Sequence, residues 1–247
     1  MLTALFLKGR LRHDLNEEER SALENAVART IEIRPRTTLV ERGKLIEHSY
    51  YLVEGTMLRH IDDRRGERQL VAVHIPGDFV DLHGYAMKRL DHDVGSLTRA
   101  TLAQISHRKI TELIDAYPHL GRALWFSTLL DAAMHREWIF GLGRLNAEGR
   151  IAHLIAELIE RLRLVELYDG RVLPIPLLQR DYAEACGITP VHANRSFRTL
   201  RERGALRPCG EGRIEILDEA LIRRLGEFDG SYLYGTGELA LRTLHDR

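Results

Sequence analysis

Residues 177–206 read LLQRDYAEACGITPVHANRSFRTLRERGAL, and this stretch predicts two short helices joined by a tight turn. Apolar residues at three- and four-residue spacing give the first helix one face for packing. Gly187 can adopt the left-handed backbone conformation that ends such a helix. Thr189 and Pro190 suit the N-cap and the first position of a second helix, which we expect to end near Arg203. The pattern is typical of a helix-turn-helix.

The second of these helices divides into an apolar face, with Ala193, Phe197 and Leu200, and a polar face. Asparagine and arginine side chains can make paired hydrogen bonds to base edges in a DNA major groove, and further arginines can reach the phosphates. The residues that we expect to bind DNA are Gln179, Thr189, Val191, His192, Asn194, Arg195, Arg198, Arg201 and Arg213. The alternative is an ordinary solvated helix that is rich in arginine.

A glycine-rich segment follows the helix pair. Residues 207–213 read RPCGEGR and lead into the alternating residues 214–217, which predicts a hairpin tip and a strand. A winged helix-turn-helix carries its wing at this place, and Arg207 and Arg213 flank the tip. We expect residues 231–247 to form a short tail.

Composition limits the classes of function. The 36 basic residues balance the 36 acidic ones, so any DNA affinity must come from a local patch such as the arginines near residues 195–203. The two cysteines exclude a disulfide framework and a four-cysteine iron–sulfur cluster within one chain, and they fit a reducing, cytoplasmic setting. The apolar run at the N-terminus is too short for a signal peptide, and no stretch approaches the roughly 20 apolar residues of a membrane span.

In residues 31–106 apolar and polar residues alternate with a period of two, and short predicted strands are separated by turn residues. The predicted strands are 31–33, 38–40, 50–53, 57–61, 69–74, 79–82 and 96–106. Strands at this spacing favour an antiparallel barrel or a double-sheet jelly roll. An entry helix from Asn16 to about Thr30 precedes them. The expected fold class is therefore α+β, with a jelly-roll domain in residues 1–116 and a winged helix-turn-helix in residues 146–230.

A long helical pattern begins at Pro118, and residues 117–145 are expected to form a dimerisation helix and a hinge. Residues at approximate a/d spacing predict a seam that pairs with a second copy of the chain. The seam residues are Leu120, Leu124, Ser127, Leu130 or Asp131, Met134, Trp138 and Leu142. The alternative is that this seam packs on its own β-roll. Three glycines, Gly141, Gly143 and Gly149, are permissive enough for the hinge.

These parts together resemble the Crp/Fnr family, over roughly residues 16–228. The resemblance rests on the turn at residues 53–55, on Pro76-Gly77-Asp78-Phe79 and on the apolar stripe from Arg150. It rests also on Gln179, Asp181, Ala183, Gly187, Thr189 and Arg195. It implies a homodimeric transcription regulator that binds palindromic double-stranded DNA, contacts RNA polymerase and is either gated by a small-molecule effector or constitutive.

The departures from the family bear on the effector. Family members that bind cyclic AMP carry Gly-Glu and then Arg with Ser or Thr after the Pro-Gly-Asp turn; this chain has Asp81-Leu82 and, later, Leu90-Asp91. Asp81, Asp91 and Asp93 place negative charge where a phosphate needs donors, so cyclic AMP is not expected, although Arg89 or Arg99 could substitute. Relatives with an iron–sulfur cluster use clustered N-terminal cysteines, which are absent here. Haem is not expected either: the histidines that could ligate it, His74, His83, His92 and His107, are more often hydrogen-bonded or surface residues.

Two further expectations follow. Relatives often carry a glutamate at the position of Val191, and valine can instead pack on a thymine methyl group, so the preferred half-site should differ at that base. Arg195 is the expected guanine reader. The alternative function is a ligand-binding or metal-dependent cupin-like protein, but its clustered metal ligands, such as His-x-His, are missing around His74 and His83, and we do not expect an enzyme.

Overall fold

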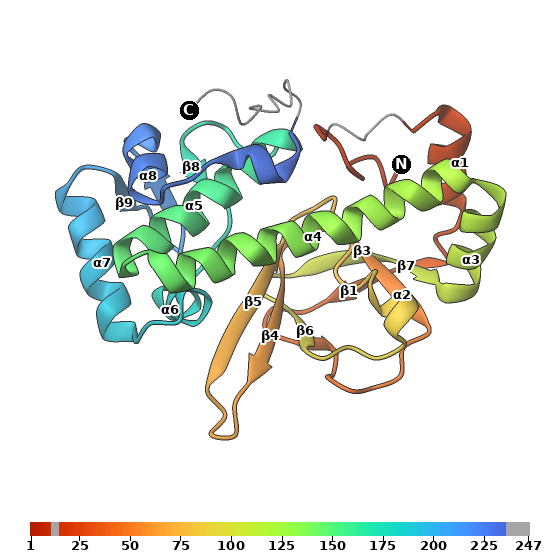
Figure 1. The fold of residues 1–247 in the computed structure, drawn as a ribbon, viewed down its shortest axis with the longest axis horizontal. Coiled ribbons are helices and arrows are strands. Elements are labelled where there is room, and N and C mark those ends of the chain that lie inside the picture. The colour runs from red at the N-terminus through yellow and green to blue at the C-terminus, as the bar shows by residue number, and fades with distance from the viewer. Residues whose placement is uncertain (11–14, 236–247) are drawn as a thin grey trace, which may run out of the picture.

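The chain builds an N-terminal β-roll and a C-terminal helical domain, which a long helix, α4 (Pro118–Arg144), connects (Figure 1). The computed structural model describes residues 1–10 and 15–235. Both domains lie along α4 (Figure 1). The order of elements confirms the predicted α+β class, with strands first, then the long helix, then the helix-turn-helix.

Two antiparallel sheets form the β-roll. Their strands are β1 (Arg29–Ile33), β2 (Thr38–Val40), β3 (His48–Glu54), β4 (Met57–Asp62), β5 (Arg68–His74), β6 (Asp93–Ser96) and β7 (Ala100–Ser106). One sheet has the order β1-β7-β3 and the other β2-β6-β4-β5. The interior is apolar, and Tyr51, Leu52 and Leu102 are fully buried in it. The first five predicted strands are confirmed to within two residues at each end.

Of the last two predicted strands, 79–82 is wrong and 96–106 is confirmed only in part. Residues 79–82 form no strand and pair only through one isolated bridge. The carbonyl of Val80 instead accepts a hydrogen bond from Nε of Arg59 at 2.7 Å, a side-chain contact that periodicity does not reveal. Residues 96–106 hold the end of β6 and the whole of β7, because the chain turns between them and its backbone N–H groups donate to the carbonyl of Thr56.

Short helices close the end of the β-roll that is farther from the C-terminal domain (Figure 1). They are α1 (Glu17–Asn25) and α3 (His107–Ala116), while α2 (Gly84–Met87) lies beside the strands. Asn16 caps α1 as predicted, in a capping box with Glu19. This helix ends before the predicted Thr30, because pairing of β1 with β7 begins at Arg29.

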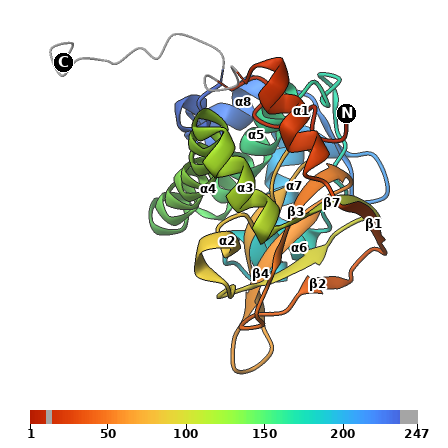
Figure 2. The same ribbon diagram turned by 90° about the vertical axis from the view of Figure 1, so that its right-hand side faces the viewer.

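Helix α4 lies on one side of the β-roll, opposite the side that carries β1 and β2 (Figure 2). The predicted dimer seam is wrong in its face: Leu120, Leu124, Leu130 and Met134 are buried against their own chain. Because Leu120 and Leu124 lie in the β-roll core and Met134 lies in the interdomain core, a charge at any of these three should disrupt the packing rather than separate subunits. The large apolar side chains that α4 exposes are Trp125, Leu129, Ile139, Phe140 and Leu142, of which Leu142 belongs to the predicted seam.

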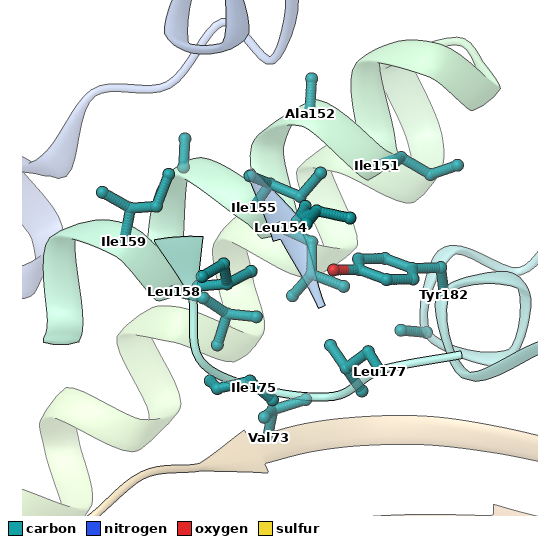
Figure 3. Close-up of a cluster of buried hydrophobic side chains, with 14 of the residues drawn as sticks. Val73, Ile151, Ala152, Leu154, Ile155, Leu158, Ile159, Ile175, Leu177 and Tyr182 are labelled. Carbon is teal, nitrogen blue, oxygen red and sulfur yellow. The ribbon is translucent and has the colours of Figure 1, made fainter. Parts of the chain in front are cut away.

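The C-terminal domain packs around α5 (Ala147–Leu164). Its other elements are β8 (Val172–Leu173), α6 (Gln179–Cys186), α7 (Pro190–Glu202), β9 (Leu206–Pro208), β10 (Ile214–Ile216), α8 (Glu219–Leu225) and the 3-10 turn η1 (Gly230–Leu233). Ile155 and Leu158 of α5 are fully buried at the centre of its core (Figure 3). Val73 of the β-roll lies in the same cluster, beside Ile175 and Leu177, so the two domains share one apolar core (Figure 3).

The junction between α4 and α5 is a corner stabilised by side chains. The helices break at Leu145 and Asn146, and Asn146 caps α5. Two of the predicted hinge glycines lie within α4 and the third within α5. The guanidinium of Arg150 donates to the carbonyls of Leu145, Leu142 and Cys186, at 2.9, 2.8 and 3.1 Å. One side chain therefore joins α4, α5 and α6.

Buried ion pairs link the β-roll to the helices that follow. Arg59 of β4 pairs with Asp131 of α4. Asp78, in the turn after β5, pairs with Arg161 of α5 at 2.6 Å, and Arg161 also donates to Glu157 at 3.3 Å. Burial alone would raise the pKa of Asp78, but the Arg161 guanidinium and His74 outweigh it and hold that pKa at about 2.

The described part of the predicted tail packs on α5. Leu233 is fully buried, and its carbonyl accepts a hydrogen bond from Arg10 of the N-terminal segment. The Tyr232 hydroxyl donates to Glu157 at 2.9 Å. Residues 236–247 lie outside the described residues, and the domain boundaries stay predictions. No helix in the described ranges is both long enough and apolar enough to cross a membrane.

Replacement of Arg161 by methionine should destabilise the fold. It leaves the buried carboxylate of Glu157 and the half-buried carboxylate of Asp78 without their guanidinium, and breaking a buried pair costs about 3–5 kcal/mol. Urea unfolding measures the loss. The matched control is Arg108→Met, which breaks the exposed pair with Glu112 and should cost less than about 0.5 kcal/mol. Equal losses of unfolding free energy in the two variants would show that the Arg161 ion pairs stabilise the fold no more than an exposed pair does.

The free energy of unfolding should depend on His74. Burial, helped by the nearby Arg59, lowers the pKa of this imidazole to about 4, whereas the unfolded value is near 6.5. Between these values the unfolded chain binds a proton that the folded chain does not, so stability is full above pH ~6.5 and falls towards pH ~4. Unfolding measured from pH 7 to pH 4.5 should show a smaller slope in His74→Asn. An unchanged slope would assign the pH dependence to other groups.

Candidate nucleic-acid interface

The turn between α6 and α7 has the predicted geometry. Gly187 ends α6 with a φ of +59°. The Thr189 hydroxyl caps α7 by accepting a hydrogen bond from the N–H of His192 at 3.3 Å, and Pro190 occupies the first turn. Both predictions for this turn are confirmed. The glycine turn and the capped start of α7 together fix the angle between the two helices.

The apolar face of α7 anchors the helix. Ala193 and Leu200 are fully buried, and Phe197 is nearly so. The Phe197 ring meets the Tyr182 ring of α6 edge-on, with centroids 4.9 Å apart. Aromatic pairs in this geometry add to the stability gained from burial, so α6 and α7 form one rigid unit. We refer to this unit as the helix pair.

The opposite face of α7 is open to solvent. Val191, His192, Asn194, Arg195, Arg198 and Arg201 are all exposed there. The side chains of Arg195, Arg198 and Arg201 make no hydrogen bond or ion pair with any residue that the structure describes. Three unneutralised guanidinium groups on one helical face are suited to anionic or hydrogen-bonding ligands.

Gln179 and Asn194 form a pair of amides across the helix pair. Nδ2 of Asn194 donates to Oε1 of Gln179 at 3.1 Å. The bond uses one group of each amide, so the oxygen of Asn194 can still accept a hydrogen bond and the nitrogen of Gln179 can still donate one. Gln179 therefore orients Asn194, a contact that helical spacing alone does not predict because the two residues lie on different helices.

Basic residues around the wing are mostly paired with acids. Arg213 pairs with Glu211 at 2.9 Å, and the two form an exposed couple at the tip. Glu215, which is buried, accepts from Arg171 of the loop before β8 at 2.7 Å and also from Arg207 of β9. An exposed ion pair such as Arg213–Glu211 is worth roughly 0–1 kcal/mol, so a phosphate can displace Glu211 from Arg213.

One basic residue of this surface escaped the sequence reasoning. Arg180 follows Gln179 at the start of α6, is exposed and makes no ion pair within residues 1–10 and 15–235. The signal that could have found it is its place at the N-terminal turn of the first helix, beside a residue already assigned to the interface.

Residues considered for an effector site take varied positions in the β-roll. Asp81 is fully buried and accepts the backbone N–H of Tyr50 at 2.7 Å, and burial raises its pKa to about 7. Asp91 and Asp93 bond to His92 and to the backbone of Arg42. Arg89 and Arg99 are exposed, where they bond to the carbonyl of Gly43 and to Glu32. Neither arginine therefore lies in the β-roll interior.

The histidines considered as ligands are spread through the same domain. His74 is fully buried, and its Nδ1 lies 3.5 Å from Oδ2 of Asp78. The rings of His83 and His92 lie 5.2 Å apart, and His107 is near the Ser49 hydroxyl. Across the described residues, no three or more His, Cys, Asp or Glu side chains gather as a metal would need.

Comparisons with known proteins agree with this architecture. Residues 30–117 match the model of the cyclic nucleotide-binding domain, and residues 149–225 match that of the Crp-like helix-turn-helix domain. The chain is 29% identical over 198 residues to the transcriptional activator protein FnrL of Cereibacter sphaeroides, with 77% of each chain covered. It is 24% identical to the nitrogen fixation regulation protein FixK of Bradyrhizobium diazoefficiens, over 81% of this chain and 82% of the other.

Solved structures show the same fold. The structure of FixK2 from Bradyrhizobium japonicum superposes with a TM-score of 0.74 at 21% identity, and covers 81% of this chain and 97% of that one. A CRP/FNR-family transcriptional regulator from Thermus thermophilus gives a TM-score of 0.64 at 19% identity, over 81% and 99% of the two chains.

Proposed function

This chain belongs to the Crp/Fnr family of transcription regulators, and on that premise we propose that it acts as a homodimer that binds a palindromic DNA site sequence-specifically. Proteins of this family are transcription regulators and not enzymes. The cupin-like alternative is not favoured, because both family models and the structural neighbours point to the regulator.

One observation carries the proposal for the reading surface. The exposed face of α7 combines guanidinium groups that have no ion-pair partner among the described residues with the oriented amide of Asn194, on a helix whose other face is anchored in a core. A helix of this kind fits the width of the major groove, and arginine there recognises guanine through two hydrogen bonds. A merely solvated arginine helix would gain nothing from the amide pair.

Each predicted DNA-binding residue has a proposed role. Arg195 reads guanine, Asn194 reads a base edge while Gln179 holds it, and the exposed Val191 packs on a thymine methyl. The remaining residues bind the sugar-phosphate backbone: Thr189, His192, Arg198, Arg201 and Arg213, to which Arg180 is added.

The dimer is proposed to form through the exposed face of α4. Trp125, Leu129, Ala132, Arg136, Ile139 and Gly143 follow spacings of four and three residues in strict alternation, as in a coiled-coil seam. Ile139 is 68% exposed and Trp125 is 63% exposed, which is unusual for side chains of this size. In such a dimer both copies of α7 lie at the same end of the paired helices, as reading two half-sites requires.

Three further features belong to the proposal. The DNA-bound dimer regulates transcription through contact with RNA polymerase, and it acts in the cytoplasm. We propose no small-molecule effector for this binding, because none of the site residues described above depends on one.

Selection from a random duplex library, followed by binding measurements at several salt concentrations, tests the function. The expected consensus is two-fold symmetric, with half-sites about one helical turn apart and affinity that falls with salt. A lack of enrichment, with or without cell extract, would leave the likeness to regulators as a likeness of fold.

Arg195→Ala should lose about 1–3 kcal/mol of binding free energy on the selected site and little on random DNA, since a base contact is lost. Fluorescence anisotropy with the two duplexes measures both. The control is Arg203→Ala, because Arg203 pairs with Glu148 at 2.8 Å and should not discriminate between the duplexes. Equal losses of Arg195→Ala on both duplexes would remove Arg195 from base reading.

Ile139→Glu should produce monomers, because it places a charge in the middle of the proposed seam. Light scattering gives the mass in solution. Leu45→Glu is the control, since Leu45 is similarly exposed, at 61%, on the β-roll. If Ile139→Glu remains dimeric, the interface lies elsewhere on the chain.

A further inference from the structure

We propose that Arg36 of the β-roll is a positioning residue for DNA reading: its ion pair with Asp181 holds the helix pair docked in the orientation that binds DNA. The inference rests on the proposed function and deepens it, because it makes DNA reading independent of an effector that would reorient the domain.

The pair joins residues that are far apart in the sequence. Nη1 and Nη2 of Arg36 donate to Oδ1 and Oδ2 of Asp181 at 2.7 and 2.8 Å, which is the bidentate geometry of the strongest arginine–carboxylate contacts. The Asp181 side chain is 1% exposed and that of Arg36 is 34% exposed. Oδ2 of Asp181 also accepts the backbone N–H of Leu178 at 2.7 Å, so the same carboxylate caps α6.

The local fold around residue 36 does not itself call for an arginine. Arg36 has a φ of +57°, the left-handed conformation that glycine adopts far more easily. Its backbone N–H donates to the carbonyl of Ser96, a bond that any residue except proline can make. Among the described residues, the Arg36 guanidinium donates its hydrogen bonds to Asp181, and Glu184 of the same helix also attracts its charge, so the arginine is explained by the helix pair and not by the turn.

Other contacts place α6 on the same surface of the β-roll. Nε2 of Gln69, on β5, donates to the carbonyl of Ala185 at 3.3 Å. Leu70 and Val73 of β5 belong to one apolar cluster with Leu177 and Tyr182. The ion pair of Asp181 at the start of α6 and the hydrogen bond from Gln69 near its end therefore fix the helix at two points, with apolar packing between them.

Docking leaves the reading face free. The helix pair meets the β-roll through α6, whereas α7 lies at the end of the molecule, away from α1 and α3 (Figure 1). Two domains held at fixed angles to paired α4 helices present both reading faces at once. A domain that swings freely loses orientation entropy when the second half-site binds, and effective concentration at that half-site falls.

The test compares a full palindromic site with a duplex that carries one half-site, both bound by the intact dimer. Arg36→Gln should weaken binding to the full site about tenfold or more and leave binding to the single half-site unchanged. The double variant Arg36→Gln with Asp181→Asn removes both charges, keeps an acceptor for the N–H of Leu178 and should behave in the same way. It guards against unfolding caused by an unpaired buried carboxylate.

Arg99→Gln is the matched control, because Arg99 pairs with Glu32 on the β-roll surface and does not touch the helix pair. It should bind both duplexes as the unmodified chain does. Equal weakening of Arg36→Gln on both duplexes, no weakening, or tighter binding to the full site would each overturn the proposal. Failure of the unmodified chain to bind any selected site would instead overturn the proposed function.

Discussion

A carboxylate that stays ionised away from water needs a charged partner, and this requirement links the parts of the molecule. Asp131 on α4 and Asp181 on α6 pair with the β-roll residues Arg59 and Arg36, and Asp78 in the turn after β5 pairs with Arg161 of α5. A buried pair adds little to stability compared with apolar packing, but breaking it is costly, so such pairs favour one arrangement over its competitors. The β-roll is tied in this way to each of the three helices that follow it.

These ties explain how a fold with a strand-rich half and a helical half becomes one body. The apolar core runs from β5 into the helical domain without interruption, and Arg150 closes the corner between α4 and α5. The consequence for the proposed function is geometric: α7 stands on an anchored support, and its orientation is set by the β-roll. Specificity then depends on a few side chains of one helical face, and affinity depends on two such faces being presented together.

The sequence predicted the local elements well, because their signals are local. The capping box at Asn16, the left-handed turn at Gly187 and the apolar face of α7 all rest on residues within about two helical turns of one another. The errors arose where contacts between residues far apart in the sequence determine the structure. The a/d pattern of α4 could not say which of two apolar stripes faces the β-roll, and neither the Val80–Arg59 bond nor the Arg36–Asp181 pair leaves a periodic trace. The partner of Asn194 was missed for the same reason, since Gln179 lies on the other helix.

The most direct measurement is the distance between the two helix pairs of the dimer in solution. A spin label on a cysteine introduced at position 202, the last residue of α7, reports this distance by pulsed electron–electron double resonance. The exposed Cys209 is first replaced by serine so that it takes no label, whereas Cys186 is buried and stays. The account predicts one narrow distance distribution that is the same in the free dimer and on the palindromic site. A broad distribution that narrows or shifts only when DNA or an added effector binds would contradict it.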